Sequence, residues 1–164
     1  MEEKRKKTIK RSVETAHQLM QVLESLSQST KGSIQYAKGI AKTSKSVNDK
    51  IQSIVEELRD KHVRDKDTDR YFNLAAQLSQ VDENKLKEGD LKELDKLKDE
   101  KKELEATNSG LTEAYDEWMK ASEKTLKKEI SIQVYCIKES EMPNEVSPAT
   151  MKHLYENDLI MEDL

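Results

Sequence analysis

Histidine and cysteine, which could act in catalysis or bind a metal, are few in this sequence, and they lie far apart. His17, His62 and His153 each stand alone, and no two of them have the spacing of metal ligands. Cys136 is the only cysteine, has no histidine near it along the chain and cannot form an internal disulfide. We therefore predict no metal site, and a reducing intracellular compartment, cytoplasmic or nuclear.

Carboxylates and glycines are also arranged in a way that disfavours an active site. The 33 Asp and Glu mostly lie among the 29 Lys and Arg, on what read as helix surfaces. General acid–base catalysis needs a carboxylate in a pocket that shifts its pKa, which a narrow helical seam rarely builds. The four glycines, at positions 32, 39, 89 and 110, are isolated, so no glycine-rich phosphate loop is present. We predict a protein that is not an enzyme, with no catalytic residues and no cofactor.

A basic cluster at the N-terminus is a candidate surface for nucleic acid or anionic lipid. Peripheral binding to a membrane or to nucleic acid is therefore the alternative function. A solvated helix end is the simpler interpretation, because the net charge is -4 and the cluster has no interleaved aromatic residues. No stretch approaches the roughly 18 consecutive apolar residues of a transmembrane helix. The cluster consists of Lys4, Arg5, Lys6, Lys7, Lys10 and Arg11.

The composition favours helices with little apolar surface. Charged residues make up 38% of the chain and hydrophobic residues 34%, and both prolines lie beyond residue 140. A coiled coil needs only a narrow apolar seam, so it suits a chain with so few apolar side chains.

The first long helix is predicted over residues 4–61. Apolar and small residues from Ile9 to Ala41 recur in alternating steps of four and three, which is the a/d pattern of a coiled coil. The pattern slips by one residue near Gly39. A break between Ser29 and Gly39 is the alternative to one continuous helix.

A short helix over 68–81 follows, with Asp67 or Thr68 as its N-cap, and a connector then leads to a third helix over 90–138. Within 129–138 the apolar residues alternate like those of a strand, but the chain shows no second strand candidate to pair with it. A lone strand cannot satisfy its backbone, so we favour helix here unless a partner supplies an edge. Gly110 is a soft spot in a helix that we expect to be continuous.

The third helix carries the best candidate surface for a partner helix. Four apolar residues recur at every seventh position, and Lys101 and Asn108 interrupt the seam with polar groups. Such interruptions select register and partner, unless the two residues lie on a turn or an exposed side. Trp118 is either a core anchor or a binding hot spot. The candidate residues are Leu94, Leu97, Leu104, Asn108, Leu111, Tyr115 and Trp118.

The last segment, 141–164, breaks the helical pattern and is predicted to be a flexible or partner-binding tail. Ser147 and Pro148 have the types expected at the start of a short helix. Apolar anchors among acidic residues are typical of a docking peptide. The anchors are Met151, Leu154, Leu159 and Ile160.

Together these features predict an all-α fold, with an elongated coiled coil, helical hairpin or bundle over 1–140 and the separable tail over 141–164. The predicted function is that of a structural subunit or adaptor of an intracellular complex, which binds protein partners by helix packing and forms homo- or hetero-oligomers.

Overall fold

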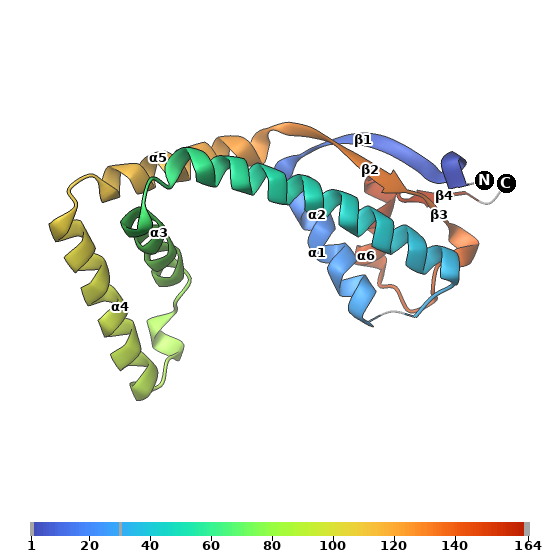
Figure 1. The fold of residues 1–164 in the computed structure, drawn as a ribbon. Helices are drawn as coiled ribbons and strands as arrows, with labels where there is room; N and C mark the ends of the chain where they lie inside the picture. Colours follow the sequence, from blue (N-terminus) through green and yellow to red (C-terminus); the bar gives the residue numbers. More distant parts are fainter. Residues whose placement is uncertain (1, 30, 163–164) are drawn as a thin grey trace. The chain divides into compact units, whose positions relative to one another are not determined.

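The computed structural model describes residues 2–29 and 31–162, and most of them are helical (Figure 1). The all-α prediction is therefore right in its coarse sense, although two small sheets are also present. The α-helices are α1 (Val13–Ser29), α2 (Ile34–His62), α3 (Lys66–Ser79), α4 (Glu88–Thr107), α5 (Leu111–Lys127) and α6 (Pro148–Glu156). The strands are β1 (Lys6–Ser12), β2 (Glu129–Tyr135), β3 (Ile137–Lys138) and β4 (Ile160–Met161), and short 3-10 turns cover Glu2–Arg5, Glu83–Lys85 and Glu139–Glu141.

The chain divides into two units, and the boundaries fall within α2 and α5. The first unit contains the chain up to Val55 and from Lys124 onward, and the second contains Glu56–Glu123. This division differs from the predicted one, in which residues 1–140 form a single elongated region.

The first unit is built on an antiparallel ribbon of β1 and β2, whose registers place Ile9 opposite Ile132 (Figure 1). One face of the ribbon carries the buried apolar residues Ile9, Ile130, Ile132 and Val134. The opposite face carries exposed polar residues such as Thr8 and Gln133. This alternation is that of a sheet covered on one side only.

The helices α1, α2 and α6 contribute the rest of this core. The apolar stripe of α1 is buried, and its members are Val13, Ala16, Leu19, Leu23 and Leu26. The stripe that follows the slip near Gly39 buries Ile40, Val47 and Ile51. These faces pack against the ribbon and α6 within the chain, so the periodicity marks helices of a globular core, and the predicted coiled coil is not confirmed.

Two corrections concern the predicted helix over 4–61. Residues 6–12 form β1, and the helix begins only at Val13, where the Ser12 hydroxyl accepts a hydrogen bond from the Thr15 N–H at 3.1 Å. A second start follows at Ile34, where the Ser33 hydroxyl accepts from the Tyr36 N–H at 3.1 Å. The break between Ser29 and Gly39, which was the alternative, is confirmed.

The C-terminal segment belongs to this core and is not a flexible tail. Ser147 caps α6 by accepting from the Thr150 N–H at 3.2 Å, and Pro148 is the first helical residue, as predicted. The helix ends at a turn in which Asp158 has a φ of 59°. The Leu159 N–H then donates to the Leu154 carbonyl at 3.0 Å, a bond that closes a Schellman-type C-cap. This turn sends Leu159 into the core and places β4 parallel to β3.

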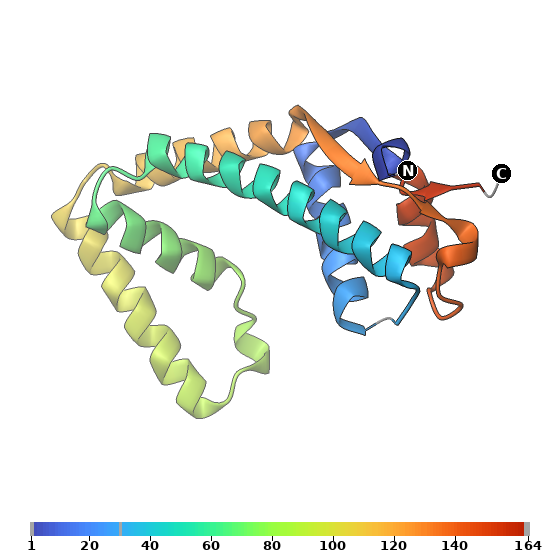
Figure 2. The same ribbon diagram turned by 45° about the vertical axis from the view of Figure 1, so that its right-hand side comes forward.

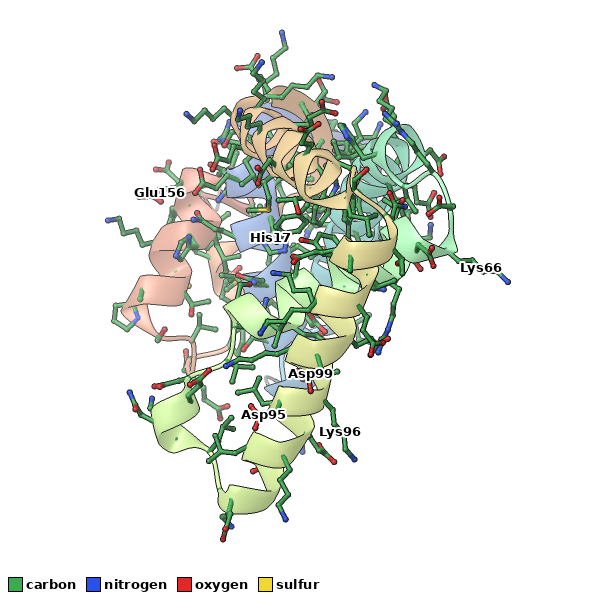
Figure 3. The ribbon with its side chains drawn as sticks, turned by 90° about the vertical axis from the view of Figure 1, so that its left-hand side faces the viewer. His17, Lys66, Asp95, Lys96, Asp99 and Glu156 are labelled. Atoms are coloured by element: carbon green, nitrogen blue, oxygen red, sulfur yellow. The ribbon has the colours of Figure 1, made fainter. Side chains whose placement is uncertain are left out.

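The second unit contains two antiparallel neighbours, α3 and α4, joined by the turn at Glu83–Lys85 (Figure 2). The predicted helix over 68–81 is confirmed with a shift of two residues, because Asp65 is the N-cap and accepts from the Thr68 N–H at 2.8 Å. Arg70 of α3 donates two hydrogen bonds, at 2.6 and 2.7 Å, to the carboxylate of Glu100 in α4. The outer side of α4 is charged, and Figure 3 shows Asp95, Lys96 and Asp99 projecting from it.

The predicted continuous helix over 90–138 is wrong in two places. It ends at Thr107 and restarts at Leu111, with Asn108 and Gly110 in the turn between α4 and α5. Residues 129–135 form β2, so the preference for helix there is also wrong. Its partner strand comes from this chain and was missed because β1 is rich in lysine and arginine.

Candidate functional site

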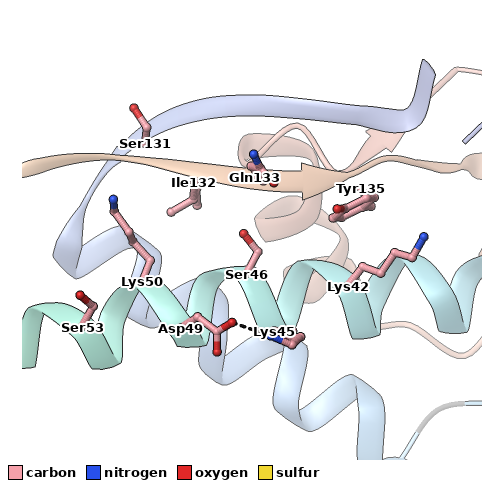
Figure 4. Close-up of a pocket in the computed structure, with 10 residues that line it drawn as sticks. All are labelled: Lys42, Lys45, Ser46, Asp49, Lys50, Ser53, Ser131, Ile132, Gln133 and Tyr135. Carbon is pink, nitrogen blue, oxygen red and sulfur yellow. Dashed lines mark hydrogen bonds and ion pairs between the residues drawn. The ribbon is translucent and has the colours of Figure 1, made fainter. Parts of the chain in front are cut away.

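A groove of about 570 Å³ lies between α2 and β2 within the first unit (Figure 4). One wall is the α2 surface, and the other is the edge of β2 together with its residues up to Tyr135. Figure 4 shows Ser46 and Lys50 of α2 directed toward the strand. The lining residues are Lys42, Lys45, Ser46, Asp49, Lys50, Ser53, Ser131, Ile132, Gln133 and Tyr135.

The edge of β2 that faces this groove carries unpaired backbone groups. At the two ends of the ribbon, the Cys136 N–H donates to the Arg5 carbonyl at 2.8 Å and the Val13 N–H donates to the Lys128 carbonyl at 2.9 Å. Hydrogen-bonded and non-hydrogen-bonded pairs alternate along an antiparallel ladder. In this register, the even-numbered residues of β2 hydrogen-bond to β1 through their backbone. The N–H and C=O groups of the odd-numbered residues point away from β1.

The outward-facing groups meet different environments along the strand. The Tyr135 N–H donates to the buried Thr43 hydroxyl of α2 at 2.9 Å. At Ser131 and Gln133, by contrast, no described residue hydrogen-bonds to the outward N–H or C=O. The edge of β2 is therefore closed to a further strand at Tyr135 and open at Ser131 and Gln133.

Close contact between α2 and the strands fixes the closed end of the groove. Gly39 has no side chain, and a Cβ atom at this position would lie 2.6 Å from Cγ1 of Ile137, which is fully buried. The Lys42 ammonium lies 5.2 Å from the centre of the Tyr135 ring, within the range of a cation–π contact. Sequence reasoning noted Gly39 as a slip in a repeat and missed that it brings a helix against a strand.

The groove is predominantly basic. Lys42, Lys45 and Lys50 line it, and Asp49 is the one carboxylate among its lining residues. Asp49 pairs with Lys45 at 2.7 Å, and this contact raises the pKa of the Lys45 ammonium. With three lysines and one carboxylate, the lining of the groove has a net positive charge, and its hydroxyl and amide groups add hydrogen-bond donors.

Cys136 lies beside a much smaller cavity at the closed end. The lining residues of that cavity include Arg5, Gln35 and Lys38, and no described histidine is among them. Burial raises the pKa of the Cys136 thiol, and its Sγ lies 3.4 Å from the Asp158 carbonyl oxygen. A raised thiol pKa lowers the thiolate fraction, so this arrangement does not activate a nucleophile.

The residues of the predicted basic cluster lie partly in β1, which places their side chains on different faces of the strand. The Lys7 and Arg11 side chains share the inner face of β1 with Ile9, and they pair with the Asp158 carboxylate at 3.6 and 3.2 Å. Arg5 donates two hydrogen bonds of 2.7 Å to Glu141. The remaining members, Lys4, Lys6 and Lys10, are exposed.

The pair of Arg5 and Glu141 makes a pH-dependent contribution to stability. The Arg5 hydrogen bonds hold the pKa of the Glu141 carboxyl below its usual value. A lowered folded-state pKa gives stability that is present above the unfolded pKa of about 4.3 and is lost as the pH falls through the folded-state pKa. We expect Glu141→Gln to lower the free energy of unfolding by about 1–2 kcal/mol at neutral pH and to have a smaller effect near pH 3, measured by urea unfolding. An equal loss at both pH values, or the same behaviour in the exposed Glu145→Gln control, would contradict it.

The predicted seam residues lie in the second unit, and the structure brings only some of them together. Tyr71, Phe72 and Leu111 form its buried cluster, against which Leu104, Tyr115 and Trp118 pack. Leu94 is buried elsewhere on α4, Leu97 is half-buried, and Asn108 lies in the turn, where its side chain accepts from the Gly110 N–H. Lys101 lies over the Tyr71 ring at 5.7 Å, so the polar interruption of the seam contacts a neighbouring helix of the same chain.

Of the predicted tail anchors, Leu154 and Leu159 are fully buried in the core of the first unit, with Met151 and Ile160 packed against it. Among the described residues, no group of histidine, cysteine and carboxylate side chains has the arrangement of a metal site. None of the described helices combines the length and the apolar character needed to cross a membrane. No protein-family model, curated protein or solved structure matches this chain.

Proposed function

We propose that this chain is a non-catalytic adaptor or structural subunit, and that it binds a partner protein in the groove between α2 and β2. The binding mode is strand addition, in which an extended segment of the partner pairs with the free edge of β2. The observation that carries this proposal is the unpaired N–H and C=O groups of Ser131 and Gln133 along a groove.

Strand addition suits this edge because the main chain supplies the affinity and the flanking pockets supply the specificity. Each hydrogen bond made by the added strand contributes about 0.5–1.5 kcal/mol net. The outer edge of β1 also has unpaired groups, but it has exposed Lys6 and Lys10 beside it, a common protection against pairing. The β2 edge differs because α2 forms a second wall.

The adaptor role also agrees with the placement of the other candidate surfaces. Arg5, Lys7 and Arg11 are held by carboxylates of the same chain, which weakens the case for a basic N-terminal surface. The leucines of the tail lie in the core. The groove, by contrast, keeps unpaired backbone groups beside a second wall.

The test uses a substitution that removes one edge donor and leaves the ladder intact. Peptides are selected from a random displayed library on the purified chain and then measured against variants. We expect Ser131→Pro to abolish binding of groove-directed peptides, because proline lacks the outward N–H, whereas Ser131→Ala should bind within about twofold of the original chain. Proline is tolerated where the N–H faces away from the ladder, so β1–β2 pairing survives.

Two further measurements keep the outcome decisive. Circular dichroism and urea unfolding should show that Ser131→Pro retains its fold, and Gln133→Pro is the replacement variant if it does not. Selected peptides that bind Ser131→Pro as tightly as Ser131→Ala would overturn the proposed function, and so would a selection that yields no binding peptide.

A further inference from the structure

We infer that the segment bound in the groove is acidic: an extended stretch of about five residues whose carboxylates face the lysines of α2. This inference rests on the proposed function and adds the chemistry of the partner. It is carried by three features of the groove, namely the charge of its helical wall, the length of the open β2 edge and the position of α2 beside that edge.

The charge extends beyond the groove along α2. Lys38 lines the small cavity next to Tyr135, and Lys42 lines both this cavity and the groove, so the two hollows are adjacent. Lys38 and Lys42 are four residues apart on one helix face, where like charges repel. Arg5 at the same end is held by Glu141. A ligand that brings carboxylates to this wall relieves the repulsion and gains ion pairs.

The length of the open edge sets the size of the occupant. Tyr135 uses its outward N–H for Thr43, so pairing is available from Glu129 to Gln133. Five residues of strand cover about 17 Å. Glu129 is itself acidic, and it lies outside the groove lining at the far end of β2. The carboxylates of the occupant therefore belong over the half of the groove nearer Lys42, where Glu129 does not repel them.

The position of α2 decides what kind of chain can enter. Figure 4 shows α2 running alongside β2, with Ser46 and Lys50 between the helix axis and the strand. A strand that is already part of a sheet brings further strands with it, and these would meet α2. A second copy of this chain would bring its own α2 to the same edge. A single extended segment, from a loop or a chain end of another protein, avoids both conflicts.

The experiment measures binding of synthetic peptides by fluorescence anisotropy. The probe is a labelled peptide of about eight alternating glutamate and valine residues, which is long enough to span β2. One comparison peptide has lysine in place of glutamate, and a second has threonine. A third is the glutamate peptide N-methylated at alternate positions, which removes the donors of one strand edge. Inorganic phosphate is added as a competitor.

We expect the glutamate peptide to bind more tightly than the threonine and lysine peptides, with an affinity that falls as salt rises. The triple variant Lys42→Gln, Lys45→Gln, Lys50→Gln should weaken its binding about tenfold, because it removes three positive charges from the lining of the groove. The control is Lys4→Gln, Lys6→Gln, Lys10→Gln, which removes the same charge from exposed positions outside the groove and should change binding less than twofold.

The other outcomes separate the two proposals. If the threonine or lysine peptide binds as tightly as the glutamate peptide and loses binding with Ser131→Pro, the acidic occupant is wrong and strand addition stands. If the N-methylated glutamate peptide binds unchanged, or phosphate displaces the peptide at equal concentration, the groove is a simple anion site and both proposals fail. Absence of binding by the glutamate peptide overturns the acidic occupant, and the binding of library-selected peptides to Ser131→Pro and Ser131→Ala then judges strand addition alone.

Discussion

Replacing Leu154 by alanine is expected to lower the free energy of unfolding by about 2–5 kcal/mol, the range for a buried leucine whose loss leaves a cavity. Leu154 is fully buried in the core of the first unit, in the cluster that also contains Leu19, Leu23 and Leu159. Its carbonyl also accepts the bond that closes the turn after α6. Urea unfolding followed by circular dichroism measures the change.

The matched control is Leu126→Ala in α5, because that leucine is 42% exposed. Its loss leaves no closed cavity, and alanine is at least as good a helix former, so the change should stay within about 0.5 kcal/mol. A deletion of residues 148–164 should remove more structure than its own nine-residue helix contains. If Leu154→Ala costs less than about 1 kcal/mol and the deletion leaves the remaining helicity intact, the segment is a separable tail.

The difference between the predicted tail and the observed core segment has a specific physical cause. Ser147 and Pro148 predicted the start of α6 correctly because capping is a local interaction. The destination of Leu154 and Leu159 depends on the turn at Asp158, where a residue other than glycine adopts a positive φ. Aspartate tolerates a positive φ, but an aspartate in a sequence does not by itself predict that conformation.

The strands were missed for a related reason. Residues 129–135 show the alternation of a strand in the sequence, but no other segment has the pattern of a partner strand. The partner, Lys6–Ser12, has one buried apolar residue, Ile9, between Lys7 and Arg11. Both cations pair with the carboxylate of Asp158, which lies far along the chain. Asp158 is brought next to Lys7 and Arg11 only by the tertiary structure. From the sequence alone, the basic strand therefore resembles a solvated helix end.

The candidate groove follows from the same pairing. The lysines of α2 are evident in the sequence. Which of them face the edge of β2 depends on the strand register and on the close approach of α2 at Gly39. The helical periodicity of α2 and of α3 was readable because 3.6-residue spacing is local. The breaks at residues 31–33 and 108–110 were harder to predict, since Gly32 and Gly110 were each compatible with a tolerated glycine inside a helix.

The second large effect is expected at Phe72, the central ring of the cluster in the second unit. Phe72 is 4% exposed, and its ring is stacked on Trp118 at 5.0 Å between centroids, with Tyr115 at 5.5 Å in an edge contact. Truncating a buried phenylalanine costs about 3–5 kcal/mol, and lost aromatic pairs contribute about 0.5–1.5 kcal/mol each within such totals. We expect Phe72→Ala to destabilise the second unit by about 3–5 kcal/mol.

Trp118 makes this measurement local, because it is the only tryptophan in the sequence. Its emission should shift to longer wavelength in folded Phe72→Ala, since the stacked ring that covers one face is gone, and the unfolding transition seen by fluorescence should move to lower urea. Phe72→Leu keeps an apolar side chain but loses both aromatic pairs, so it should cost about 1–3 kcal/mol, less than Phe72→Ala. An unchanged transition in Phe72→Ala would mean that the four rings, which join α3 to α5, are a surface patch and contribute nothing to the core. Their edge and stacked geometries, together with the burial of Tyr71 and Phe72, argue for the core.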